Sequence, residues 1–212
     1  MEKISKLAAI SFLSAVTLSQ DVQALDWFKQ KPPASASMGI LQGNKNVGGG
    51  FSDLLHQGKP IGNKLDGKYM LVYFGTSYRL PNCSVDLLLL QEVSREIERK
   101  CGSGVATVFI SPEHNKSLHP APDNLTQYVD AKGSKIIGLV GSQIRVMDVA
   151  SGYKARYFLN GGGVPNNHTR FTYLMEKGQN LAIIPADLPL PIIVDHVLRT
   201  IKEDTRLSCD LK

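Results

Sequence analysis

Tyr69-Met70-Leu71-Val72-Tyr73-Phe74 is an unbroken run of six apolar and aromatic residues. A run this short and this apolar is typical of a strand that is buried on both faces, which implies a parallel sheet covered by helices. Helical spacing of apolar residues follows at Leu87–Lys100, with Ser84 and Asp86 as start signals and Gly102 as the stop. A second buried strand is predicted at Val105–Ile110, so the three segments form a right-handed strand–helix–strand crossover.

The rest of the chain continues the alternation of helices and strands. The expected elements are a short helix near Asn124–Ala131, a turn reaching Ile136–Leu139, a helix at Ser142–Ala150 that Ser142 caps, strands at Lys154–Leu159 and Asn180–Ile184 with a glycine-rich hairpin loop between them, and a last helix at Pro191–Glu203. This order predicts an α/β, thioredoxin-like fold with a central mixed sheet flanked by helices, an N-terminal hairpin and an inserted helix.

Composition argues for one globular domain without nucleic-acid chemistry. The chain has 212 residues, 42% of them hydrophobic and 20% charged, with a formal net charge of +5. This is enough chain for one sizeable core. The basic residues are scattered and not interleaved with aromatic ones, so no nucleic-acid partner is expected. Nucleophile-elbow, phosphate-loop and zinc motifs are absent, so no enzyme activity beyond thiol redox chemistry is predicted.

The N-terminus has the pattern of an export signal. Lys3 and Lys6 precede a short apolar core at Leu7–Leu18, and Val22-Gln23-Ala24 offers small residues for cleavage. We therefore predict a signal peptide at 1–24, a linker at 25–46, a folded domain at 47–212 and a periplasmic or otherwise extracytoplasmic location. A retained membrane anchor is the alternative, although a spanning helix needs about 20 apolar residues.

Five segments, in order, resemble the Sco/SenC family of thioredoxin-like copper chaperones for cytochrome c oxidase assembly. They are Gly48-Gly49-Gly50-Phe51, Gly58-Lys59-Pro60, Leu65–Gly75, Val108-Phe109-Ile110-Ser111 and Gly138-Leu139-Val140-Gly141-Ser142. The resemblance covers residues 47 to 203. It implies a role in oxidase assembly or copper homeostasis, with an oxidase subunit or a redox protein as the partner.

The copper ligands of this family are only partly retained. The family uses two Cys in one loop and a distant His, a soft set that suits Cu(I). The resemblance places Arg79 at the first Cys and Cys83 at the second, and it places Lys177 at the His. On this alignment the metal site is degenerate, and copper binding is expected to be weak or absent.

Other residues offer substitutes for the missing ligands. A site of Cys83, His168 and Met175 would be chemically suited to Cu(I). Cys83 precedes the first helix, where the helix dipole lowers a thiol pKa, so it could instead act alone as a redox thiol. It could also pack as a small buried remnant. A third function, that of a thioredoxin-fold adaptor without chemistry, stays open too.

Three cysteines leave at least one thiol unpaired within the chain. In a thioredoxin fold the first and last helices share one face of the sheet and end at the edge opposite the active loop. Cys101 and Cys209 follow these two helices, so we hypothesise a Cys101–Cys209 disulfide.

Overall fold

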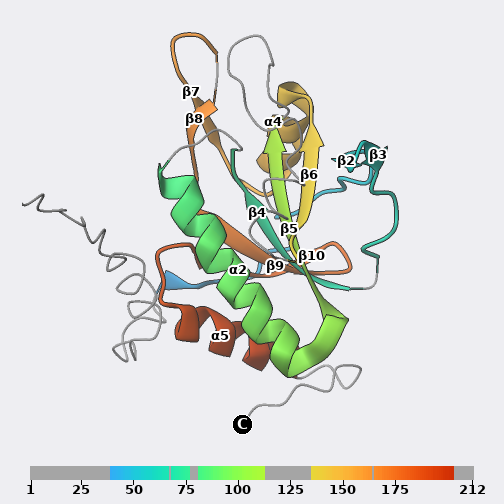
Figure 1. Ribbon diagram of the computed structural model, residues 1–212, viewed down its shortest axis with the longest axis vertical. Helices are drawn as coiled ribbons and strands as arrows, with labels where there is room; N and C mark the ends of the chain where they lie inside the picture. The colour runs from blue at the N-terminus through green and yellow to red at the C-terminus, as the bar shows by residue number, and fades with distance from the viewer. Residues whose placement is uncertain (1–38, 67, 77–80, 113–134, 164, 203–212) are drawn as a thin grey trace, which may run out of the picture.

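The computed structural model describes residues 39–66, 68–76, 81–112, 135–163 and 165–202 (Figure 1). The side chains of residues 81–84, 103 and 166 also lie outside the described part. The predicted signal peptide and the helix expected near Asn124–Ala131 fall outside these ranges. None of the helices within them is long and apolar enough to cross a membrane.

An eight-stranded mixed sheet forms the centre of the molecule, in the order β1-β10-β9-β4-β5-β6-β2-β3. Its strands are β1 (Leu41–Gln42), β2 (Leu55–His56), β3 (Lys59–Pro60), β4 (Tyr69–Phe74), β5 (Val105–Pro112), β6 (Ile137–Gly141), β9 (Phe171–Glu176) and β10 (Gln179–Pro185). Strands β4, β5 and β6 are parallel, whereas β9 is antiparallel to β4 and β10 is antiparallel to β9. The mixed α/β sheet and the N-terminal β2–β3 hairpin confirm the predicted fold.

The central strand β4 divides its side chains between two cores, as the period of a strand requires. Tyr69 and Leu71 pack against helices α2 (Pro81–Cys101) and α5 (Leu190–Lys202) on one face. Val72 and Phe74 pack on the other face, with helix α4 (Gln143–Gly152). Figure 1 shows α2 in front of the sheet with α5 below it, and α4 behind. All six residues of β4 are buried, which confirms the strand predicted from this run.

Local signals explain where the helices begin and end. The side chain of Ser142 accepts a hydrogen bond from the amide of Arg145 at 3.3 Å and caps α4, the helix predicted to begin at this residue. Helix α2 begins at Pro81, earlier than the spacing of its apolar residues suggests, and Pro is favoured in a first turn. It ends at Cys101, before Gly102 with φ 61° and a short 3₁₀ turn, η2 (Gly102–Gly104).

Three details differ from the sequence-based expectation. Strand β1 lies inside the segment predicted as a linker and pairs with β10. Strand β9 was not predicted. It forms the hairpin with β10, whereas the sequence-based expectation paired Lys154–Leu159 with that strand. The segment at β7 (Tyr157–Leu159) instead pairs with β8 (Pro165–His168) in a separate two-stranded ribbon, which projects at the top of Figure 1.

Candidate functional site

The carboxyl edge of the parallel strands is the natural place for a site in this fold, because chain segments meet there after each strand. Strand β4 ends at Phe74, and Gly75 follows it. A Cβ on Gly75 would come within 2.6 Å of the ring of Phe109, so only glycine fits at this close approach. Helix α2 begins at the same edge, with Cys83 in its first turn.

His168 lies at this edge as well. It ends β8, and it precedes β9, whose Thr172 pairs with Tyr73 near the end of β4. The imidazole is 5% exposed and packs edge-on against the ring of Tyr73, with 5.7 Å between the ring centroids. Its Nδ1 lies 3.1 Å from the carbonyl oxygen of Thr169. Because a carbonyl only accepts, Nδ1 carries the proton in this bond, and the Nε2 lone pair is the one suited to a metal.

Tyr157 holds the β7–β8 ribbon on the same edge. Its hydroxyl donates to the carbonyl oxygen of Gly75 at 2.9 Å and also lies 3.3 Å from that of Ile110. Tyr157 and His168 are paired across the ribbon, with ring centroids 6.1 Å apart. The ribbon therefore places His168 directly over the end of β4.

A buried acidic residue completes this edge. Asp86 lies one helical turn after Cys83 on α2, and its side chain is fully buried. The hydroxyl of Tyr73 donates to Asp86 Oδ2 at 2.5 Å. Arg170 donates from Nε to Oδ2 at 2.8 Å and from NH2 to Oδ1 at 2.5 Å. We call Tyr73, Asp86 and Arg170 the Asp86 network. The hydrogen bonds to Asp86 raise the pKa of Arg170, so its guanidinium stays protonated.

Lys177 is placed at the opposite edge of the sheet. It forms the turn between β9 and β10 with Gly178, at φ 47°, and it is exposed. The neighbouring Glu176 pairs with Tyr69, four residues before the Tyr73–Thr172 pair, so about 13 Å of strand separates the two ends. The structure therefore does not bring Lys177 to the first turn of α2. It lines a cavity of about 630 Å³ together with Phe51, Met70 and Tyr153, among others.

Met175 is also remote from His168. It is fully buried on the α4 face of the sheet, where it pairs with Met70. Its sulfur lies 3.5 Å from the Asn180 side-chain amide, which donates to it. Of the two substitute ligands predicted from the sequence, the structure places only His168 at the edge where α2 begins. Within the described residues, no cluster of three or more His, Cys, Asp or Glu side chains could hold a metal.

The remaining cysteines lie at the far end of α2 and beyond. Cys101, the last residue of this helix, is buried and disulfide-bonded. Cys83 lies 18 residues earlier on the same helix, about 27 Å away, which excludes it as the partner within one chain. Cys209 and Arg79 lie outside the described residues.

From the sequence, Asp86 is expected only to start a helix, and Arg170 has no predicted role. A signal was present for Asp86, because Leu89, Leu90 and Val93 follow it at helical spacing and form the buried face of α2. A carboxylate on such a face needs a partner. Arg170 had a weaker signal, as a charged residue directly before the apolar strand Phe171–Glu176.

The fold and this edge define a thioredoxin-like α/β protein whose candidate site is a first-turn cysteine and a buried histidine. The family model SCO1/SenC matches residues 40–202. The chain belongs to the SCO1/SenC family.

Individual relatives agree with this assignment. Protein SenC of Rhodobacter capsulatus is 27% identical over 183 residues, which cover 83% of this chain and 81% of that protein. A SCO2-like protein of Rickettsia conorii is 30% identical over 151 residues, 68% of this chain and 71% of that one. Among solved structures, Arabidopsis thaliana ScoI with copper bound has a TM-score of 0.62 at 25% identity and covers 74% of this chain and 99% of its own.

Proposed function

We propose that this protein is an exported accessory factor in respiratory cytochrome oxidase assembly or copper homeostasis, and that it binds copper weakly through Cys83 and His168. The observation that carries the proposal is the position of His168, buried at the edge where the first turn of α2 places Cys83. The family assignment supports it, and solved relatives include copper-bound ScoI of Arabidopsis thaliana.

The donor set fits copper in part. A thiolate and an imidazole are soft to intermediate ligands that suit Cu(I). The Nδ1 bond of His168 to a backbone carbonyl is the outer contact by which proteins orient a metal-binding imidazole. With Arg79 at the position of the family's first Cys, one protein ligand fewer remains, so we expect weaker binding than in a family member with all three ligands.

Contact with a partner protein belongs to the same proposal. Val85 and Leu88 are half-exposed on the first turns of α2, and Phe158 and Leu159 are half-exposed on the ribbon that carries His168. A contiguous exposed apolar patch is typical of a protein interface, and we propose that these four side chains form one. We propose that an oxidase subunit or a redox protein docks at this end of the molecule.

Export is proposed from the sequence of residues 1–24. The disulfide at Cys101 supports it, because disulfides persist mainly in oxidising compartments. Cys209 is the proposed partner of Cys101, since Cys83 is too far along the helix. In that case Cys83 is the thiol left for chemistry.

A thiol redox function through Cys83 is the second candidate, favoured by its place in the first turn of a helix. Copper titration, followed by thiolate-to-metal absorption on the wild type and on Cys83→Ser, separates the candidates. Absorption that is lost in Cys83→Ser supports copper binding. Rapid alkylation of Cys83 without any copper absorption supports the redox function. If neither signal appears, both are wrong and an adaptor role remains.

A further inference from the structure

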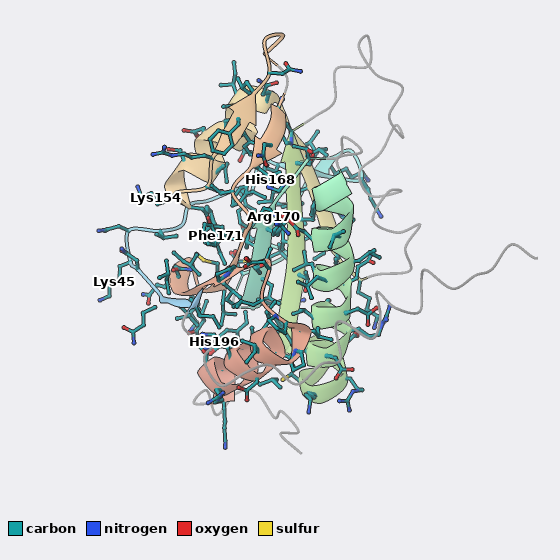
Figure 2. All side chains as sticks on the ribbon, turned by 90° about the vertical axis from the view of Figure 1, so that its left-hand side faces the viewer. Lys45, Lys154, His168, Arg170, Phe171 and His196 are labelled. Carbon is teal, nitrogen blue, oxygen red and sulfur yellow. The ribbon has the colours of Figure 1, made fainter. Side chains whose placement is uncertain are left out.

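The Asp86 network connects the two chain segments that carry the candidate ligands. Asp86 lies three residues after Cys83 on α2, so the two positions fall on the same side of the helix. Arg170 lies two residues after His168, in the segment that joins β8 to β9. Figure 2 shows His168 and Arg170 near the upper half of α2. A single ion pair therefore joins the first turns of α2 to the histidine segment.

The geometry of this ion pair restricts movement more than one hydrogen bond would. Arg170 uses two nitrogens on the two oxygens of Asp86, and such a planar fork fixes the relative orientation of both groups. The backbone of Arg170 is itself held, because its carbonyl oxygen accepts from the amide of Ala186 at 3.0 Å. On the other side, Tyr73 of the central strand donates to the same carboxylate. The helix, the histidine segment and the sheet thus meet at Asp86.

We propose that Arg170 is a positioning residue: through Asp86 it fixes the separation between the first turn of α2 and His168, and so sets how well the pair binds copper. In this role Arg170 acts through Asp86 and is not itself a copper ligand. The functional consequence rests on the proposed copper site, but the contact between Arg170 and Asp86 is present without metal.

The first arm of the test needs no copper. Hydrogen exchange, followed by mass spectrometry, is measured on the metal-free protein for the start of α2 and for residues 165–172. We expect Arg170→Ala to accelerate exchange in both segments together. Arg145→Ala is the matched control, since Arg145 makes the same two-nitrogen contact with Asp53, at 2.7 and 2.8 Å, at the start of α4 on the other face of the sheet. Ile201→Ala is the control for a general loss of stability, because Ile201 is fully buried on α5.

The second arm measures Cu(I) affinity by competition with a chromophoric chelator. Loss of an outer contact to a metal site commonly weakens binding by about ten- to a hundredfold, and we expect this for Arg170→Ala. Arg145→Ala and Ile201→Ala should bind as the wild type does. Arg170→Lys keeps a positive charge beside Asp86 without the fork, so it folds more readily and should weaken binding to an intermediate degree.

Hydrogen exchange and Cu(I) affinity together distinguish a failure of the proposed copper site from a failure of the positioning role of Arg170. If the wild type binds no Cu(I), the proposed copper function fails, and the exchange data alone decide on the link. Unchanged exchange in Arg170→Ala, or copper affinity lost equally in Ile201→Ala, would overturn the positioning role. Coupled faster exchange with a selective loss of affinity supports it.

Discussion

Helix α2 is held in different ways at its two ends. Near its start, at the edge of Cys83 and His168, Asp86 is held by hydrogen bonds and charge from Arg170 and Tyr73. At its end, Cys101 is held by a disulfide and lies in the core shared with α5. The reversible contact is at the candidate site and the covalent one is remote from it. The candidate site therefore adjoins the noncovalent anchor of α2, and the covalent anchor lies at the other end of the helix.

Removal of Arg170 is the strongest test of this contrast. Arg170→Ala would leave the fully buried Asp86 carboxylate without its cation. Breaking a fully buried pair costs about 3 to 5 kcal/mol of the free energy of unfolding, and we expect a loss towards the lower end, because Arg170 is itself 38% exposed and water screens the contact. The Asp53 carboxylate is 56% exposed, so Arg145→Ala should cost less than about 1 kcal/mol. Urea denaturation of both variants measures the difference. Equal losses of the free energy of unfolding in the two variants would show that the burial of Asp86 does not strengthen its ion pair with Arg170.

Removal of the disulfide tests the other end of α2. Cys209→Ser should lower the free energy of unfolding by about 2 to 4 kcal/mol, the usual worth of a disulfide that closes a long loop. Cys83→Ser should lower it much less. Thermal unfolding of the two variants, each in oxidised and reduced form, makes the comparison. The proposed pairing is wrong if Cys209→Ser unfolds like the wild type and if Cys101 of the oxidised wild-type protein reacts with a thiol reagent.

The smallest effect is expected from pH, at α5. Burial lowers the pKa of the His196 imidazole, so the unfolded chain binds a proton at a pH where the folded chain does not. The free energy of unfolding should therefore fall as the pH drops below about 6.5, and less so in His196→Gln. Urea midpoints at pH 7.5 and 5.5 test this. Parallel declines in both proteins would exclude His196 as the cause.

Much of the fold could be predicted from the sequence, because β4 and β5 are short continuous apolar runs and α5 has a clear helical period. No strand was expected at β9, because the segment before Lys177 served only to align that residue with the family's histidine. The two-residue turn at Lys177-Gly178 explains the error physically. Its positive φ angles at both residues define a hairpin turn, which the sequence alone did not reveal.

The candidate site was predictable only in part. Cys83 was named from the family resemblance and His168 from its chemistry, but Lys177 was aligned with the family's histidine, one strand length away from the edge where His168 lies. Asp86 and Arg170 are 84 positions apart, and nothing local in the sequence pairs them. Such a contact follows from sheet topology, since it needs β9 to lie beside β4.

We propose that His168, and not Lys177, shares a copper site with Cys83. Cu(I) affinity of the mature, folded protein should be measured for the wild type, His168→Ala and Lys177→Ala, by competition with a chromophoric chelator. We predict a loss of at least about a hundredfold in Cu(I) affinity for His168→Ala, since a lost ligand should cost no less than a lost outer contact. Lys177→Ala should bind as the wild type does. Undiminished binding by His168→Ala, or a loss confined to Lys177→Ala, would contradict it.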